Sequence, residues 1–592
     1  MATNFKSDSV IVKLDPTASP SEITNLQAAM RVTKVTTAPQ FGIGIWQIPS
    51  GTVDRIILAY ANDPRVQYME RDSIITLPDV KTTSRTQENL ATITPQTTTP
   101  NDPGYPLLWG LNNTGQTGGK PDADIDAPEA WDIQTGNQNT VIGVIDTGVD
   151  YTHPDLVGNI WTNPGETAGD GIDNDNNGYI DDVRGWDFAY NDNDPMDVDG
   201  HGTHVSGTIA AKGNNSVGVI GVAWKAQIMP LKFLDDSGSG SISNAILALN
   251  YATAKGVKLT NNSWGGGPYS QALYDAIKTA EEKGALFIAA AGNSSQNTDV
   301  RPFYPASYNL PNIISVASTT HNDGLSSFSN YGRTTVDLGA PGSEIYSTTP
   351  GGNYDTYSGT SMASPHVTGA AALVWSQNPS WTAQQVKNRL LETTDPLAAL
   401  RLKTVSKGRL NIHKALGGST STDNSNLRQM QLRIAPTPPG SAGAGNLTET
   451  ANAADSIKDL ADPSAGNTAN NTLKQETGED SLTGGPGADT LMLPFAQSSV
   501  SPKDPLTHFG SEKIDLVPQG GAAINAPSLF SPAANTTVPS LEKDLSPGFT
   551  EANGALAGNQ ALEINSDPLR VAKAGWMADI YPGLYDAKPL GI

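Results

Sequence analysis

The chain contains no cysteine among its 592 residues. Disulfide bonds and thiolate metal sites are therefore excluded, although that absence does not identify the redox compartment. Basic residues are also scarce, because 37 Lys and Arg stand against 60 Asp and Glu and the net charge is −23. Such an acidic chain is a poor partner for nucleic acid, and its Asp-rich surface suits divalent cations.

Long apolar runs are missing as well. No stretch approaches the roughly 18 apolar residues that a membrane span requires. The N-terminal residues Met1–Asp8 contain no apolar core of the kind found in a secretory signal. We therefore expect neither a membrane span nor a standard N-terminal signal.

Residues 1–78 have the pattern of a small α/β domain. Apolar residues recur at helical spacing from Ser21 to Met30, directly after Pro20. The other predicted elements are strands at 9–14, 42–48 and 66–70 and a helix at 53–61. Residues 79–100 are rich in Thr, Gln and Pro, and this composition predicts an exposed linker.

From 101 to 417 apolar runs of strand length alternate with helical stretches. The predicted strands are 141–145, 228–231, 259–263, 286–291 and 313–317, and the predicted helices are 241–255, 270–283 and 363–377. This alternation predicts an α/β fold with a mostly parallel sheet sandwiched by helices. Ligands of such sheets bind beyond the carboxyl ends of the strands.

Four polar residues lie in or beside small-residue motifs of this region: Asp146 in Asp-Thr-Gly, His201 in Gly-His-Gly-Thr-His, Asn293 in Ala-Gly-Asn, and Ser361 in Gly-Thr-Ser-Met-Ala-Ser-Pro. Each has an ordinary explanation when taken alone. Asp and Asn after a strand often form turns, a His can be a metal ligand or a core residue, and a Ser before a helix can be a cap.

Taken together and in this order, the four motifs resemble those of the subtilases, the subtilisin-like serine proteases. The resemblance implies that Ser361 is the nucleophile, His201 the general base and Asp146 the residue that orients it. Asn293 and the backbone N–H of Ser361 would bind the oxyanion. His204 and His366 are expected to be structural. The segments 236–241 and 263–267 resemble those that flank an extended peptide, and Trp264 would shape the main side-chain pocket together with 289–292.

The most acidic loop of the chain runs from Asp173 to Asp182 and predicts a calcium site. Oxygen ligands stand at alternate positions and a glycine follows, as at the start of an EF-hand loop. The predicted ligands are Asp173, Asp175, Asn177, Tyr179 and Asp182. A solvated acidic turn is the alternative, but so many carboxylates would repel one another without a cation.

The resemblance implies a second calcium site. Asp155 matches the family's calcium-ligand Asp, and the loop 214–219 matches its calcium loop. Asn215 would supply a side-chain oxygen, and Val217 and Val219 would supply carbonyl oxygens. Asp192 and Asp194 are further candidates. Calcium would stabilise the folded state without taking part in the chemistry.

Residues 1–78 resemble a subtilase propeptide, an inhibitor-like domain, with self-cleavage expected between about 79 and 101. Beyond the catalytic domain we expect a linker at 418–475, a calcium and export segment at 476–516 and a low-complexity tail at 517–592, largely disordered. The middle segment contains Gly-Gly-Pro-Gly-Ala-Asp489, which resembles the RTX calcium repeat.

The sequence thus predicts a calcium-stabilised serine endopeptidase made as a self-processing zymogen, monomeric, acting on polypeptides and inhibited by its own propeptide. RTX proteins leave the cell by type I export without an N-terminal signal, so an extracellular or cell-surface location is expected, with a cytoplasmic one left open. The alternatives are an inactive pseudoprotease and a calcium-binding surface protein.

Overall fold

The computed structural model describes residues 4–77, 81–82 and 100–418, together with five short strands between residues 464 and 507. Most of the expected linker at 79–100 and most of the expected tail lie outside the described residues. Among the described residues, none of the helices combines the length and apolar character needed to cross a bilayer.

The N-terminal domain, residues 4–77, is a four-stranded antiparallel sheet with two helices. Its elements are β1 Phe5–Leu14, α1 Pro20–Met30, β2 Lys34–Ala38, β3 Ile43–Gln47, α2 Val53–Tyr60 and β4 Val66–Thr76. Helix α1 begins where Ser19 and Glu22 form a reciprocal capping box around Pro20. The strand expected at 66–70 continues to Thr76, and β2 was not expected from the sequence.

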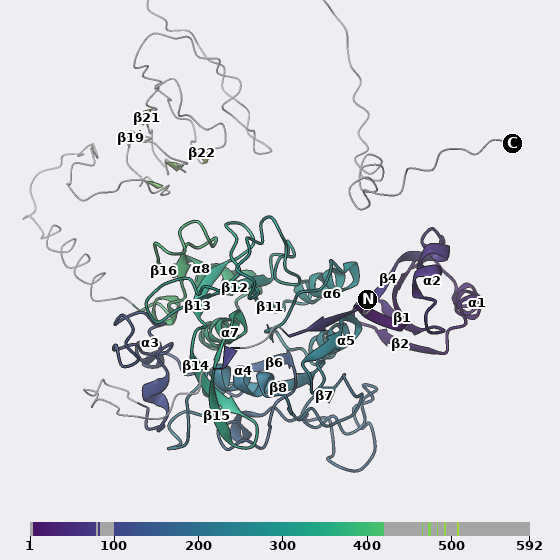
Figure 1. Cartoon of the computed structure of the whole chain (residues 1–592), viewed down its shortest axis with the longest axis horizontal. Helices are drawn as coiled ribbons and strands as arrows, with labels where there is room; N and C mark the ends of the chain where they lie inside the picture. Colours follow the sequence, from purple (N-terminus) through teal and green to yellow (C-terminus); the bar gives the residue numbers. More distant parts are fainter. Residues whose placement is uncertain are drawn as a thin grey trace, which may run out of the picture. The chain divides into compact units, whose positions relative to one another are not determined.

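Alternate residues of β1 serve two different cores, as the two-residue period of a strand requires. Val10 and Val12 pack with Leu26 of α1 in the core of the N-terminal domain. Ile11, between them, belongs to a core shared with the following domain. Helices α1 and α2 cover the side of the purple sheet that is turned away from α5 and α6 (Figure 1).

The second domain, residues 100–418, is built on a nine-stranded sheet of order β16-β17-β13-β12-β11-β10-β6-β8-β7. Its strands are β6 Val141–Asp146, β7 Trp186–Asp187, β8 Gln227–Lys232, β10 Leu259–Asn262, β11 Leu286–Ala290, β12 Ile313–Thr319, β13 Leu338–Pro341, β16 Asp395–Pro396 and β17 Gly408–Arg409. All neighbours pair in parallel except β16 with β17. The predicted α/β class with a mostly parallel sheet is confirmed.

Helices cover both faces of this sheet, and each face has its own core. The helices are α3 Ala127–Trp131, α4 His201–Ala210, α5 Ile242–Ala254, α6 Gln271–Glu282, α7 Thr360–Gln377, α8 Ala383–Glu392 and α9 Ile412–Ala415, with single 3-10 turns at Tyr105–Leu107 and Val157–Asn159. Val144 of β6 faces the core of α4 and α7, whereas Ile145 faces that of α5 and α6. Buried parallel strands therefore read as continuous apolar runs.

Two smaller sheets complete the described structure. In one, β14 Ile345–Thr349 pairs with β15 Asn353–Ser358, and β15 also pairs with the two-residue strand β5 Lys81–Thr82. In the other, β9 Ser239–Ser241 pairs antiparallel with β4 and so extends the sheet of the N-terminal domain. Both pairings bring the chain around residues 74–82 against the second domain.

The five strands near the C-terminal end are β18 Ser464–Ala465, β19 Thr472–Lys474, β20 Leu482–Thr483, β21 Thr490–Met492 and β22 Leu506–Thr507. They pair in parallel, with Ser464 beside Leu482 and Thr472 beside Thr490, each partner lying 18 residues further along the chain.

Candidate active site

Asp146 and His201 meet where β6 ends and α4 begins. Nδ1 of His201 lies 2.7 Å from Oδ1 of Asp146, and both side chains are almost completely buried, at 2% and 0% exposure. A proton on Nδ1 leaves Nε2 as the ring nitrogen that can accept another proton. The sequence placed both residues at this edge, and the structure brings them into direct contact.

Opposing effects act on the pKa of His201. Burial lowers it, but the charge of Asp146 and the hydrogen bond to it act the other way, with help from Asp199 and Asp197, and the net result is a raised pKa. The imidazolium that forms during acyl transfer is therefore stabilised at this position.

A second buried carboxylate, Asp197, ties the start of α4 to the turn after β6. It accepts hydrogen bonds from the Thr147 hydroxyl at 2.9 Å, from the Gly200 N–H, and from both the N–H and the hydroxyl of Thr203. The Thr147 hydroxyl in turn accepts the N–H of Gly202 at 2.9 Å. Sequence analysis missed Asp197, although its place four residues before His201 suits an acid near a helix N-terminus.

Ser361 lies in the first turn of α7, which begins at Thr360 and not at 363 as expected. Its hydroxyl donates to the carbonyl oxygen of Ser263 at 2.9 Å, at the end of β10. The side chain is 2% exposed. The N–H groups of a first helical turn have no partner within the helix, so that of Ser361 is one that can bind an anion.

Asn293 is held beside the serine by its neighbour Thr360. The carboxamide oxygen of Asn293 accepts the Thr360 N–H at 2.9 Å and the Thr360 hydroxyl at 2.8 Å. Because the oxygen is engaged in this way, the amide nitrogen is the atom of Asn293 left to donate. A Cβ added to Gly359 would lie 3.3 Å from that nitrogen, so the backbone before the serine passes close to it.

The two other histidines of this region are buried and held in their neutral form. Burial lowers the pKa of His204 to about 3 and that of His366 to about 4. His204 stacks on Tyr357 with ring centroids 4.3 Å apart, and His366 Nδ1 lies 2.8 Å from the Met362 carbonyl oxygen. Trp264 is also buried, 2% exposed, and packs against Phe233.

The end of β4 lies along the edge that the sequence assigned to an extended peptide. Ile75 pairs with Gly240 and Thr76 with Ser239, and the N–H of Leu77 donates to the Gly238 carbonyl oxygen at 2.9 Å. The N-terminal domain therefore occupies this edge as an added antiparallel strand.

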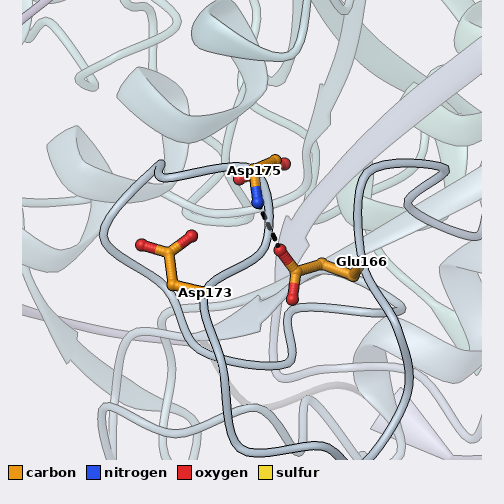
Figure 2. Close-up of side chains that lie close together, drawn as sticks. All are labelled: Glu166, Asp173 and Asp175. Atoms are coloured by element: carbon orange, nitrogen blue, oxygen red, sulfur yellow. Dashed lines mark hydrogen bonds between the residues drawn. The ribbon is translucent and has the colours of Figure 1, made fainter.

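In the acidic loop, Glu166, Asp173 and Asp175 converge so that one carboxylate oxygen of each lies within 4.8 Å of the others (Figure 2). Sequence analysis predicted the two aspartates but missed Glu166, which precedes the loop. Within the described part of the chain, Glu166 Oε2 and Asp175 Oδ1 are buried without a hydrogen-bond partner. Unpaired carboxylate oxygens at this spacing fit a hard cation such as calcium.

The remaining predicted ligands of this loop point elsewhere. Asp182 is fully buried and accepts hydrogen bonds from Asn163 and Asn177, each at 2.7 Å, and from Tyr251. The ring of Tyr179 lies against Tyr251, 5.2 Å between centroids. Asp182 thus anchors the loop through protein donors.

At the second predicted site the loop 214–219 does close over Asp155, which is fully buried. Asp155 accepts from the Asn215 amide nitrogen at 2.8 Å and from the Val219 N–H at 2.8 Å. Asn215 uses its oxygen for the Val217 N–H, so ligation through that oxygen requires the amide to turn. Asp102, missed in the sequence, joins the loop by accepting the N–H of Asn215 at 3.2 Å. Burial and then, more weakly, the charge of Asp155 raise its pKa.

A parallel α/β sheet with a buried Asp–His pair and a helix-borne serine at one edge is the framework of a serine endopeptidase. Comparison with known proteins agrees. Residues 137–429 match the model of the subtilase family, and residues 2–72 match that of the fervidolysin N-terminal prodomain.

Individual relatives give the same result. The chain is 40% identical over 318 residues to thermitase of Thermoactinomyces vulgaris, which covers 54% of this chain and 99% of that protein. It is 37% identical over 368 residues to a thermophilic serine proteinase of Bacillus sp. strain AK1, covering 62% and 76%. Fervidolysin of Fervidobacterium pennivorans, described as a keratinolytic enzyme related to subtilisin, superposes with a TM-score of 0.56 at 27% identity, covering 71% of this chain and 62% of that one. The chain belongs to the subtilase family.

Proposed function

We propose that this serine endopeptidase hydrolyses polypeptides through Asp146, His201 and Ser361, with Asn293 and the Ser361 N–H binding the oxyanion. The contact of 2.7 Å between the buried Asp146 and His201 carries the proposal. Ser361 would turn from the Ser263 carbonyl toward His201 when substrate binds, since catalytic hydrogen bonds often tighten only in the substrate complex.

In the reaction, His201 takes the proton of the Ser361 hydroxyl as the oxygen attacks the scissile carbonyl carbon. The negative charge that develops on the carbonyl oxygen is met by the Asn293 amide and the Ser361 N–H. His201 then passes its proton to the leaving amine, and water repeats the sequence to release the acyl group from Ser361.

The prodomain is proposed to act as an intramolecular inhibitor that is removed by self-cleavage after β4. Its support is the pairing of β4 with β9, which places a strand of the chain's own along the substrate edge. The proposed boundaries are those of the sequence: prodomain 1–78, processed linker 79–100 and catalytic domain 101–417. The protein is proposed to act as a monomer.

Calcium is proposed to stabilise the catalytic domain. The carboxylates of Glu166, Asp173 and Asp175 would hold one ion, and Asp155 with the loop around Asn215 would hold another. Bound calcium would supply positive charge that relieves repulsion between these carboxylates. None of these residues contacts the Asp146–His201 pair in the hydrogen bonds described, so the ion has no role in the chemical steps.

An extracellular location is proposed on the resemblance of 476–516 to an RTX segment. The parallel pairing of β18 with β20 and of β19 with β21, at a constant interval of 18 residues, supports a repeated coil in this segment. Export that is unchanged after deletion of 476–592 would refute this part of the proposal.

Labelling with a fluorophosphonate tests the enzyme mechanism directly. Purified protein with calcium should be labelled on Ser361, and Ser361→Ala should abolish labelling. Ser364→Ala, one turn further along α7, is the matched control and should keep it. Labelling that survives Ser361→Ala refutes the assigned nucleophile, and failure of the wild-type protein to be labelled or to cleave casein favours a pseudoprotease.

A further inference from the structure

Two carboxylates of the prodomain strand β4 bind the N-termini of two helices of the catalytic domain. Glu70 accepts the Gln271 N–H at 2.9 Å and the Ser270 hydroxyl at the start of α6. Asp72 accepts the Ser243 N–H at 2.9 Å and the Ser243 hydroxyl at 2.7 Å at the start of α5. The two acids are alternate residues of one strand, so both point to the same side.

The donors that hold these acids are not used by the helices themselves. The N-cap Ser241 of α5 accepts from Asn244, and the N-cap Ser270 of α6 accepts from Leu273, which are the third residues of their helices. The N–H groups of Ser243 and Gln271 are left for an external acceptor. When the prodomain departs, these donors remain on the catalytic domain together with the positive ends of both helix dipoles.

The two donor sets continue the edge strand on which peptides are expected to bind. Residues 74–76 of β4 pair with β9, and the acids lie just before this paired segment. Ile75, three residues after Asp72, is 2% exposed and shares a buried core with Ile242 of α5. A substrate strand that pairs with β9 in the same register would extend past both helix N-termini.

We propose that the N-termini of α5 and α6 form an exosite for extended polypeptide substrates with the pattern acidic-x-acidic-x-x-aliphatic. This inference rests on the proposed function and names a substrate class for it. The aliphatic residue takes the place of Ile75, and the two acids take the places of Asp72 and Glu70. Each acid gains charge-assisted hydrogen bonds from a backbone N–H and a serine hydroxyl.

Neighbouring charges set the register of this pattern. Asp275 of α6 is bound by Lys13 and Tyr68 of the prodomain, at 3.0 and 3.1 Å. Once the prodomain is gone, Asp275 disfavours an acidic residue at the place of Tyr68. The chain as a whole carries a charge of −23, so long-range electrostatics also work against acidic peptides. A preference for acids in one register therefore reports the local donors.

The test uses the enzyme recovered after its own processing of the full chain and two internally quenched peptides of equal composition and charge. One carries its acids five and three residues before an isoleucine, and the other carries them six and four residues before it. The first should be cleaved with a kcat/KM about tenfold higher. Equal kcat/KM values overturn the exosite.

Gln271→Pro removes only the donor N–H and the side chain, since proline is accepted at the first position of a helix and Ser270 has the extended conformation that precedes proline. This variant should lower the tenfold ratio to about threefold, whereas Gln271→Ala, which keeps the N–H, should preserve it. An unchanged ratio in Gln271→Pro overturns the proposal. If that variant does not fold, Ser243→Ala takes its place, with the same expected decrease in the ratio.

If neither peptide is cleaved, the proposed function fails and the exosite is judged separately by binding. Fluorescence anisotropy of the two labelled peptides on the same preparation then decides. Tighter binding of the peptide in the first register supports the exosite, and equal affinities refute it.

Discussion

Asp197 accepts the hydroxyl of Thr147 at 2.9 Å, and this buried contact joins the turn that follows Asp146 to the residues that precede His201. The two halves of the Asp–His pair come from segments more than fifty residues apart. Asp197 holds those segments together, because its other donors belong to the N-terminal turn of α4.

Replacement of Asp197 should destabilise the fold. Asp197→Ala leaves buried donors of Thr147, Gly200 and Thr203 without an acceptor, so we expect a loss of about 3 kcal/mol in the free energy of unfolding. Asp197→Asn keeps one acceptor and should cost less. Urea unfolding of both variants in the Ser361→Ala background, which prevents autolysis, measures the difference. A change of less than 0.5 kcal/mol ~ the level of ordinary surface substitutions would contradict the network.

Asn293→Ala should lower kcat about 10²–10³-fold and leave KM nearly unchanged, because the lost donor acts on charge that exists only in the transition state. That magnitude is known for the oxyanion donor of subtilisin, a member of the same family. Steady-state kinetics on a peptide substrate measures both constants, and Asn297→Ala serves as a control on a nearby loop. A rise in KM at constant kcat would assign Asn293 to ground-state binding instead.

The acid limb of the pH profile should reflect the raised pKa of His201. The ring must be neutral to accept the serine proton, so kcat/KM should fall as the pH decreases through a pKa above the ordinary value of about 6.5. Asp199 contributes to that raised pKa, and Asp199→Asn should therefore move the limb to lower pH. Asp170→Asn, in the acidic loop, is the charge-matched control. A limb that stays in place in Asp199→Asn contradicts this electrostatic assignment.

Removal of calcium should lower the thermal stability. Saturation of one site at a hundredfold excess over Kd contributes about 2.7 kcal/mol, so EDTA should decrease the melting temperature by several degrees. Glu166→Gln should reduce this EDTA-sensitive difference, whereas Asp181→Asn, whose carboxylate accepts loop N–H groups instead, should retain it. Scanning calorimetry of the Ser361→Ala protein provides the measurement. Identical melting curves with calcium and with EDTA would refute a stabilising ion.

Much of the active-site edge could be predicted because its residues stand in short contiguous motifs. Asp146 follows an apolar run that can only be a buried strand, and Ser361 follows a Gly-Thr turn before an apolar helix. The fold class followed from the alternation of such runs. Where the prediction placed the start of α7 at 363, the structure places it at Thr360, because the polar Thr-Ser pair carries no apolar signal of its own.

The residues that sequence analysis missed depend on distant partners. Glu166 joins Asp173 and Asp175 only because the loop folds back on itself, and Asp102 reaches Asn215 across more than a hundred residues. Asp182 looks like a metal ligand in the sequence, but Asn163 and Tyr251 supply its hydrogen bonds. Which oxygens face one another is a property of packing, and a linear pattern does not contain it.

The sequence by itself determined the protease class, the identity of the catalytic candidates and the presence of an N-terminal inhibitor-like domain, because each is written in local motifs and in strand-helix periodicity. Only the tertiary structure decided that Glu70 and Asp72 bind the helices at Gln271 and Ser243. These contacts join residues about 200 and 170 positions apart, and hydrogen-bond geometry at such separations exists only once both domains have folded and met.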